Sequence, residues 1–218
     1  MISNRIKSVL YSKIIILFIA FTACGKSRDE AKEQPVSFAA PTDYDSELAR
    51  HRGEQDALFR GPKSPLEDSL KINFAGINYY PPDTNYRVVA TVEKIKNGNI
   101  FKMEATGNIA DEFKTLARLK FNLNGMDMSL EVYENQDLKK SGVTFYFIPF
   151  LDQTNGKETY GGGRYLEVPS IDGEKVILDF NYAYQPYCTY NHNYSCPIPP
   201  AINRLPIEIK AGEKLPAY

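Results

Sequence analysis

The sequence predicts a mainly β protein: an antiparallel, strongly curled sheet, sandwich or barrel of about nine strands, preceded by one N-terminal helix. Three observations support this fold class. Apolar and polar residues alternate with a period of two, tight-turn dipeptides interrupt the alternating stretches, and no helix-length segment separates them. The stretches expected to be extended are residues 71–80, 86–95, 100–106, 115–123, 128–133, 143–150, 164–168, 176–184 and 205–210.

The alternation is clearest in residues 115–123. Apolar residues occupy every second position from Ala117 to Leu123, and polar residues occupy the positions between them. Successive side chains of a strand point to opposite faces, so the pattern is typical of a strand with one buried and one solvated face. Residues 128–133 repeat it.

Three dipeptides predict tight turns: Asn97-Gly98, Asn124-Gly125 and Asp172-Gly173. Each lies between two extended stretches and tolerates the positive φ that hairpin turns require. Parallel strands would need long crossover connections, which are absent here. We therefore expect antiparallel hairpins, including one that pairs residues 164–168 with residues 176–184.

A single helix is expected near the start of the domain. Thr42 or Asp43 can cap it, and it is expected to run to about Phe59. Its apolar face is incomplete and Gly53 weakens it. The residues of that face are Tyr44, Leu48, Gln55, Leu58 and Phe59.

The first 24 residues predict export. The segment before residue 14 carries three basic residues and no acid, residues 14–21 are apolar, and small residues lead to Cys24. This is the plan of a secretory signal. The ten residues 14–23 would rise only about 15 Å as a helix, roughly half of the hydrocarbon thickness of a bilayer. A spanning helix is therefore not expected.

Residues 21–24 (FTAC) resemble a lipobox, in which the cysteine is acylated and becomes the first residue of the mature protein. An ordinary cleaved signal is the alternative, and it would leave Cys24 as a free thiol. With the lipobox, the sequence predicts a lipoprotein that carries palmitate or a similar acyl chain, since two or more chains hold a protein stably on a bilayer. We expect a cell-envelope location, at the outer membrane or cell surface rather than the inner membrane.

The chain accordingly divides into three parts: residues 1–23 as a lipoprotein signal peptide, residues 24–41 as a flexible tether and residues 42–218 as a single β domain. The tether is expected because residues 25–41 are charged, small and bounded by proline, without apolar periodicity. The remaining length suits one domain.

The charge balance excludes some partners. The whole chain has 26 basic and 27 acidic residues, and removal of the signal leaves 23 basic residues against 27 acidic ones. A net charge of about −4 argues against a nucleic-acid surface. No motif predicts a cofactor or a metal centre, and the lipid anchor is the expected link to a membrane.

Two cysteines remain in the domain, Cys188 and Cys196. In an exported protein such a pair is predicted to form a disulfide. Two free thiols are one alternative. A metal site is another, because His192 lies between the cysteines, although zinc sites usually recruit four ligands.

Several motifs resemble one family. The runs are residues 154–166 (TNGKETYGGGRYL), 179–188 (DFNYAYQPYC), 196–205 (CPIPPAINRL) and 211–213 (AGE). Residues 64–66 (SPL) and 74–81 fit as well. Together they resemble the bacterial and archaeal proteins known as domain of unknown function 1684. That family has no established activity, so the resemblance implies no mechanism, catalytic residue or cofactor.

The same region contains the candidate site. Alternation places Tyr165 and Glu167 on one face of their stretch, and Asp179 and Asn181 on one face of theirs. If the two stretches pair, these polar faces merge. Arg164 adds a guanidinium suited to a carboxylate or phosphate. A group of tyrosines follows, and tyrosines can line a sugar or peptide site. The predicted ligand-binding residues are Arg164, Tyr165, Glu167, Asp179, Asn181 and Tyr184.

Two other interpretations of these residues remain open. Arg164 can form a buried ion pair with Asp152, Glu167 or Asp179 that serves only the fold. Alternatively, Glu167 and Asp179 can act as the paired carboxylates of a hydrolase. No nucleophile or zinc-protease motif is present.

The sequence thus predicts an envelope-anchored lipoprotein that is not an enzyme and binds a small polar ligand or another envelope component. A hydrolase and a structural partner of an envelope complex are the alternatives.

Overall fold

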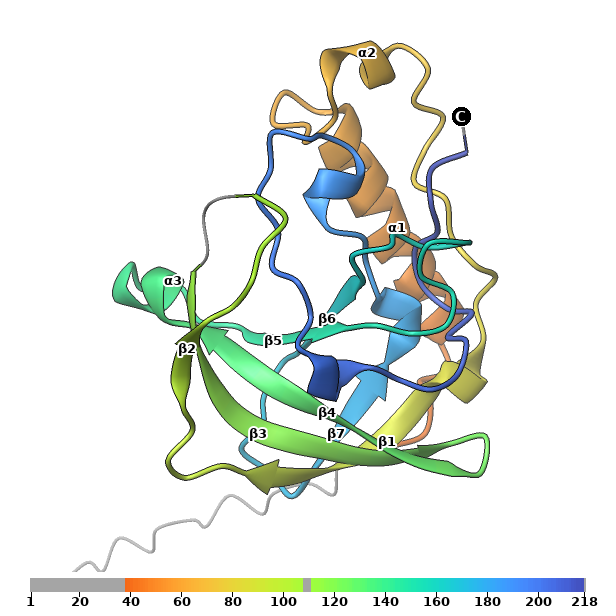
Figure 1. The fold of residues 1–218 in the computed structure, drawn as a ribbon. Helices are drawn as coiled ribbons and strands as arrows, with labels where there is room; N and C mark the ends of the chain where they lie inside the picture. Colours follow the sequence, from red (N-terminus) through yellow and green to blue (C-terminus); the bar gives the residue numbers. More distant parts are fainter. Residues whose placement is uncertain (1–37, 108–110, 218) are drawn as a thin grey trace, which may run out of the picture. The chain divides into compact units, whose positions relative to one another are not determined.

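A computed structural model describes residues 38–107 and 111–217. The predicted signal peptide, the predicted acylation site at Cys24 and most of the predicted tether lie outside these residues. One seven-stranded sheet dominates the described part, with strand order β6-β5-β4-β3-β1-β7 and with β2 paired to β3 (Figure 1). The strands are β1 (Arg87–Lys94), β2 (Ile100–Lys102), β3 (Glu112–Leu123), β4 (Met126–Asn135), β5 (Tyr146–Phe150), β6 (Arg164–Val168) and β7 (Lys175–Asp179).

All ladders between these strands are antiparallel, and the sheet curls into a half-barrel. The predicted fold class is therefore confirmed. The concave side holds the main core, which draws on every strand of the sheet except β2 and on the C-terminal segment. In Figure 1, helix α1 (Tyr44–Arg60) and the C-terminal segment lie on the same side of the curled strands.

The long hairpin of β3 and β4 forms as predicted. Leu119 lies opposite Leu130, and both side chains are completely buried. The connecting Asn124 and Gly125 have φ values of 54° and 79°, as a tight turn between twisted strands requires. Here the local sequence alone is sufficient to set the pairing.

A β-bulge in β3 changes which face the side chains occupy. The register between β3 and β4 shifts between Thr115 and Ala117. Beyond the bulge, Phe113 leaves the main core and joins a second cluster, which we call the aromatic cluster. An extra residue in one strand reverses the face of everything that follows it, which explains this switch. The buried members of the aromatic cluster are Met103, Phe113, Tyr133, Phe147 and Tyr165.

The predicted helix is confirmed as α1. Tyr44, Leu48 and Phe59 are its buried residues, whereas Leu58 is 39% exposed. Asp43 occupies the N-cap position without a side-chain capping bond. The other helical segments are short: α2 (Asp68–Lys71), α3 (Gln136–Lys140), η1 (Thr84–Tyr86), η2 (Phe180–Tyr182), η3 (Tyr187–Thr189) and η4 (Ala201–Asn203).

Two of the nine expected strands do not form. Residues 71–80 end α2 and then follow α1, where the Asp56 side chain accepts the Ile77 N–H at 2.8 Å. Residues 205–210 run beside the loop after β5, and the Leu205 N–H donates to the Leu151 carbonyl. In both segments, backbone groups form hydrogen bonds with loops and side chains instead of with a neighbouring strand.

The predicted pairing of β6 with β7 through Asp172-Gly173 is wrong. The two strands lie at opposite ends of the strand order, and β7 pairs with β1 instead, with Asp179 opposite Arg87. The curl nevertheless brings the two edges near each other. Asn97-Gly98 also makes no hairpin between its neighbouring strands, since β1 and β2 both pair with β3. Gly98 lies against the Thr115 carbonyl, where a Cβ atom would clash with the oxygen.

Candidate functional site

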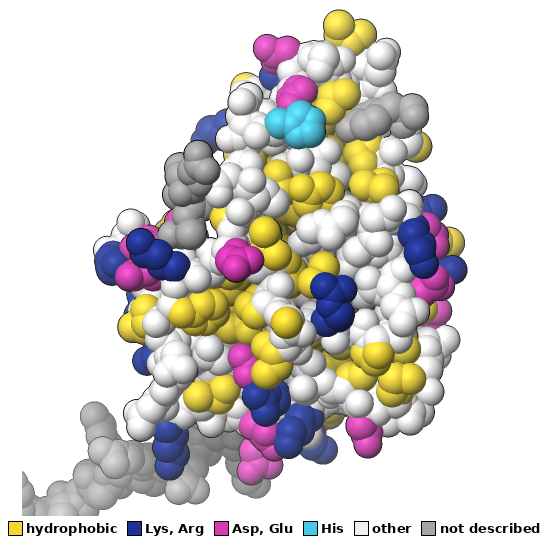
Figure 2. Space-filling view, viewed as in Figure 1, with side chains coloured by type: hydrophobic (Ala, Val, Ile, Leu, Met, Phe, Trp, Pro, Cys, Tyr) yellow, Lys and Arg dark blue, Asp and Glu magenta, His cyan; other side chains and the backbone are white. Residues whose placement is uncertain are grey.

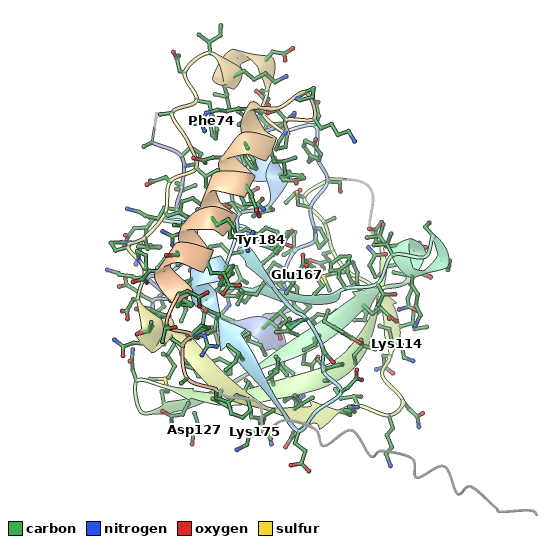
Figure 3. The ribbon with its side chains drawn as sticks, turned by 180° about the vertical axis from the view of Figure 1, so that it is seen from behind. Phe74, Lys114, Asp127, Glu167, Lys175 and Tyr184 are labelled. Carbon is green, nitrogen blue, oxygen red and sulfur yellow. The ribbon has the colours of Figure 1, made fainter. Side chains whose placement is uncertain are left out.

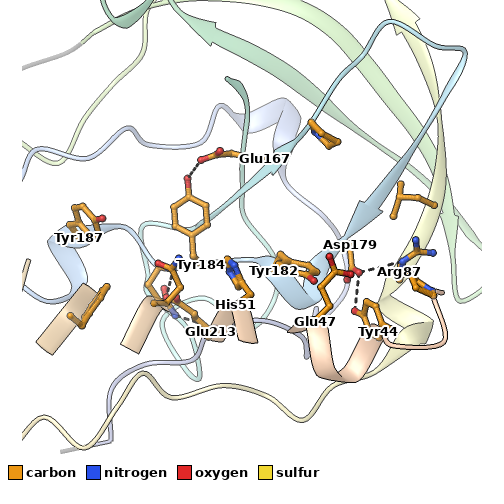
Figure 4. A pocket seen from close by; sticks show the side chains of 16 residues that line it. Tyr44, Glu47, His51, Arg87, Glu167, Asp179, Tyr182, Tyr184, Tyr187 and Glu213 are labelled. Atoms are coloured by element: carbon orange, nitrogen blue, oxygen red, sulfur yellow. Dashed lines mark hydrogen bonds and ion pairs between the residues drawn. The ribbon is translucent and has the colours of Figure 1, made fainter. Parts of the chain in front are cut away.

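A cavity of about 680 Å³ lies between α1 and the facing edges of the sheet (Figure 4). We call it the helix pocket. One stripe of α1 lines it, because residues spaced three or four apart share a helix face. The opposite wall comes from β1, β6, β7 and the segment after β7. Its lining residues are Pro41, Tyr44, Glu47, His51, Gln55, Phe59, Arg87, Glu167, Pro169, Ile177, Asp179, Tyr182, Tyr184, Gln185, Tyr187 and Glu213.

One end of the helix pocket is built around Asp179. The Tyr44 hydroxyl donates to Asp179 Oδ2 at 2.8 Å, and Arg87 Nε lies 3.6 Å from the same oxygen. The backbone N–H and the side-chain amide of Asn181 both donate to Oδ1. Burial, followed by the charge of Asp179, raises the pKa of Tyr44, so its hydroxyl remains a donor. The carboxylate thus accepts three hydrogen bonds and lies beside one guanidinium, and these contacts fix its position.

The middle of the helix pocket is formed by Glu167 and Tyr184. The Tyr184 hydroxyl donates to Glu167 Oε1 at 2.7 Å. An isolated antiparallel bridge between Tyr165 and Tyr184 holds the segment after β7 against β6. Figure 3 shows the labelled pair side by side near α1, and Figure 4 shows the bond between them. Burial is the main reason that the pKa of Tyr184 is raised, with Glu167 adding to it.

A buried carboxyl lies at the inner end of the helix pocket. Glu213 is 4% exposed and accepts a hydrogen bond from the Gln185 N–H at 2.7 Å. The Tyr190 hydroxyl is 3.4 Å from the same oxygen. Burial raises the pKa of Glu213 to about 7, because the charged form loses hydration. This group therefore changes its protonation state near neutral pH.

His51 supplies an uncharged ring to the same pocket. Its ring lies edge-on to that of Tyr182, with centroids 4.9 Å apart. Burial lowers the pKa of His51 below its ordinary value, so the imidazole is neutral at pH 7. The helix pocket thus combines acidic side chains with aromatic surface.

Three of the predicted ligand-binding residues line the helix pocket: Glu167, Asp179 and Tyr184. From the sequence, a β6–β7 hairpin is expected to bring these residues together, but this hairpin does not form. The residues meet because the two edges of the half-barrel face the same helix. The sequence reasoning missed Tyr44, Glu47, His51, Arg87 and Glu213. Only Glu213 carried a signal, since it closes the AGE run.

Arg164 does not reach this pocket. Its side chain is completely buried and lies 2.8 Å from Asp152 Oδ2. Its two terminal nitrogens also donate to the carbonyl groups of Ile209, Ala211 and Glu213. The alternative of a buried ion pair therefore describes Arg164, which attaches the C-terminal segment to β6.

Tyr165 and Asn181 also lie away from the helix pocket. Tyr165 belongs to the aromatic cluster, and its hydroxyl donates to the Pro197 carbonyl at 2.6 Å. The Asn181 side chain donates to the Asp83 carbonyl and accepts from the Asp83 N–H. This pair of bonds fixes the loop before β1 against the end of β7.

Both cysteines of the domain are buried and free, so the predicted disulfide is not formed in this structure. They lie close together, because the Cys188 N–H donates to Cys196 Sγ at 3.2 Å. Hydrogen bonds from Cys196 and from the Tyr160 hydroxyl lower the pKa of Cys188. The hydrogen bond between the two cysteine side chains raises the pKa of Cys196. Within residues 38–107 and 111–217, no three His, Cys, Asp or Glu side chains gather as metal ligands.

The described residues contain no helix whose length and apolar character would let it cross a bilayer. On the face shown in Figure 2, acidic and basic side chains are interspersed rather than separated by sign. The surface in this view therefore has no extended basic area.

The fold and the pocket define a class of protein: a half-barrel β domain with one helix packed across its facing edges. The chain belongs to the family described as protein of unknown function (DUF1684), whose model matches residues 72–214. A similar solved structure is the solution structure of an uncharacterized protein of Haloarcula marismortui. It is 34% identical, with a TM-score of 0.62, and the match covers 79% of this chain and 94% of the other. No curated protein matches the chain significantly.

Proposed function

We propose that this chain is an envelope-anchored lipoprotein whose β domain binds a small polar ligand in the helix pocket. One observation carries the binding role: a cavity of about 680 Å³ lined by carboxylates, phenols and one imidazole. Ligand sites commonly combine such concavity with a few polar groups that fix orientation. Exposed Glu47 and Glu167 give the cavity a polar mouth.

The domain can be studied without its N-terminal segment. Residues 37–218 form one compact unit. The Haloarcula protein, of which the match covers 94%, is folded in solution. Residues 37–218 therefore provide a suitable protein for binding experiments.

A thermal-shift screen of sugars, amines, amino acids and nucleotides on this domain tests the binding role. A ligand of the helix pocket is expected to raise the melting temperature, and to raise it further as its free concentration increases above its Kd. Amide signals of Glu47, Glu167 and Tyr184 are expected to move in NMR spectra when that ligand is added. The amide signal of Glu54, an exposed residue of α1 that does not line the pocket, is the control and is expected to stay in place. Failure of every polar compound to move the signals of the pocket residues would refute the binding role.

The anchor is a separate part of the proposal. It is supported by the lipobox-like residues 21–24 and by the charged segment that follows them. Mass spectrometry of the protein from its native host is expected to find an N-terminal Cys24 that carries fatty acids. Cys24→Ser is expected to release the protein from the membrane fraction. An N-terminus that still begins at Met1 would contradict the anchor.

We further propose that Cys188 and Cys196 form a disulfide when the protein is in an oxidising envelope. The two thiols would lose two protons and two electrons to a disulfide oxidant, which is itself reduced to two thiols. Closing this short loop is expected to stabilise the domain by about 2.5 kcal/mol on the chain-entropy estimate. Incubation with oxidised glutathione, followed by mass spectrometry and urea unfolding with and without a reductant, tests both statements. A stable mixed disulfide at one cysteine, with no internal bond, would contradict them.

A further inference from the structure

A second cavity of about 300 Å³ lies beside the helix pocket. We call it the aromatic pocket, because rings of the aromatic cluster and of neighbouring loops line it, beside polar residues such as Asp111 and Asn135. These rings belong to Phe113, Phe145, Phe147, Tyr165 and Tyr194. An open cavity with this lining favours an apolar group.

The two pockets are neighbours, since four residues line both of them: Glu167, Tyr184, Gln185 and Tyr187. The Tyr184–Glu167 hydrogen bond therefore forms the partition between an acidic chamber and an aromatic one. Tyr187 and Tyr194 lie at the rim with 39% and 38% exposure, and their ring centroids are 5.3 Å apart. The two chambers therefore adjoin, and the exposed Tyr187 lines both of them at the rim.

The charges of the helix pocket favour a cation. Glu47 and Glu167 are exposed carboxylates, whereas Asp179 is paired with Arg87. The one arginine in the lining, Arg87, already contacts Asp179, the Phe38 carbonyl and the Tyr44 ring. It is therefore not available to an incoming anion.

Other positive groups near the pocket are also engaged. Arg50 pairs with Glu54 at 2.6 Å, and the Arg52 guanidinium lies over the Tyr79 ring at 4.3 Å. Neither of them lines the helix pocket. Aromatic faces attract ammonium groups as well, so Tyr182 and Tyr187 add to the preference set by the carboxylates.

We infer that the two pockets together bind a cationic amphiphile, a small molecule with an ammonium head in the helix pocket and an aromatic or aliphatic tail in the aromatic pocket. This inference rests on the proposed binding function of the helix pocket and adds the ligand class. Three observations carry it: the chambers adjoin, the Tyr184–Glu167 pair lines both of them, and the carboxylates of Glu47 and Glu167 form no ion pair with the described residues, since the lining arginine pairs with Asp179.

Titration of four probes into the domain (residues 37–218) distinguishes the contribution of the ammonium head to affinity from that of the apolar tail. The probes are 4-phenylbutylammonium, 4-phenylbutan-1-ol, 4-phenylbutanoate and n-butylammonium. The phenylbutyl amine is expected to bind most tightly. Losing the phenyl group is expected to weaken binding by about tenfold, the effect of removing one ring from an apolar site. The carboxylate is expected to bind most weakly, because it meets like charges.

Two surface variants test which pocket holds the ammonium head and which holds the apolar tail. Glu47→Gln is expected to weaken the amine by about threefold and to leave the alcohol unchanged, since it removes only a partly screened charge. Tyr194→Ala is expected to weaken both phenylbutyl probes and to leave n-butylammonium unchanged. Glu54→Gln and Ile202→Ala are the matched controls, because both positions are exposed and line neither pocket.

The outcomes distinguish this inference from the proposed function. Equal affinity for the amine and the carboxylate, or no gain from the phenyl group, would overturn the ligand class while a polar ligand could still occupy the helix pocket. Binding of a polar compound from the screen with no binding of any amine would do the same. Absence of binding by all four probes and by every polar compound would overturn both.

Discussion

The domain contains two arginine–aspartate pairs that use the same chemistry for different purposes. Arg164 and Asp152 are completely buried, 2.8 Å apart, and surrounded by carbonyl groups of the C-terminal segment. Arg87 and Asp179 lie 3.6 Å apart at the wall of the helix pocket, where each side chain is 11% exposed. The first pair fastens the chain and the second shapes a cavity. Residue type alone therefore does not identify a binding arginine.

The largest effect is expected from breaking the buried pair. Arg164→Ala leaves the Asp152 carboxylate without its cation and removes the Arg164 donors from the carbonyl groups of Ile209 and Ala211, while the Glu213 carbonyl keeps a bond from Gln185. Loss of one partner of a buried pair costs about 3–5 kcal/mol of the free energy of unfolding. Urea unfolding of the variant measures the change, with the exposed Arg204→Ala as control. A cost no greater than that of Arg87→Ala would contradict the contrast between the two pairs.

Glu213 connects the two regions and is expected to make stability depend on pH. Its backbone carbonyl accepts from Arg164, while its carboxyl lines the helix pocket. Its pKa is about 7 in the folded protein and has an ordinary value of 4.5, so the folded state binds more protons between these values. The free energy of unfolding must therefore fall as pH rises through this window, by about 3 kcal/mol.

Glu213→Gln removes the titrating group and is expected to flatten this decrease. Urea unfolding at pH 5 and pH 8 measures it. Glu208→Gln is the matched control, because Glu208 is exposed and pairs with Lys210. The expectation is contradicted if the wild-type protein is more stable at pH 8 than at pH 5 and Glu213→Gln shows the same pH dependence. The burial of this carboxyl would then have no such effect on stability.

A smaller effect is expected from breaking the pocket pair. Arg87→Ala leaves Asp179 with hydrogen bonds from Tyr44 and Asn181. Because three donors remain, we expect a loss of about 1 kcal/mol, within the range for partly screened pairs and single hydrogen bonds. The variant should remain folded by circular dichroism, which allows its ligand binding to be compared with that of the wild type. If the variant is unfolded at room temperature, this expectation is contradicted. The Arg87–Asp179 pair would then support the fold, as the Arg164–Asp152 pair does.

The smallest effect is expected at the partition between the pockets. Tyr184→Phe keeps the ring and removes the hydroxyl that donates to Glu167. The expected loss is about 0.5–1 kcal/mol, since Glu167 is exposed and water can replace the bond. Tyr194→Phe, at the rim, is the control in the same unfolding experiment. A loss of several kcal/mol would mean that the Tyr184–Glu167 bond supports the fold rather than only the pocket.

The local parts of the fold were predictable. The side-chain faces of β3, the extent of α1 and the Asn124-Gly125 turn follow from periodicity and from the φ values that these residues allow. The position of Phe113 was not predictable, because the bulge after Thr115 reverses the face without leaving a clear signal in the sequence. Asp172-Gly173 shows the same limit, since a turn dipeptide sets a local bend and not the partner of each strand.

For the candidate site, alternation correctly placed Glu167 and Asp179 on outward faces of β6 and β7, but it could not measure burial. Arg164 was expected to contact a ligand and is instead sealed beneath the C-terminal segment. Glu47 and His51 belong to α1, more than a hundred residues before Glu167, and only packing brings them together. The ion pair of Arg164 was foreseen only as one of several alternatives.

The family, the mainly β class, the single long helix and the face that most side chains occupy follow from the residues alone, because each depends on short-range periodicity, turn chemistry or shared motifs. The strand order, the burial of Arg164 and the cavity between α1 and the sheet edges follow only from the folded arrangement. These features depend on contacts between distant segments, and those contacts are selected by how the curled sheet buries its apolar surface as a whole.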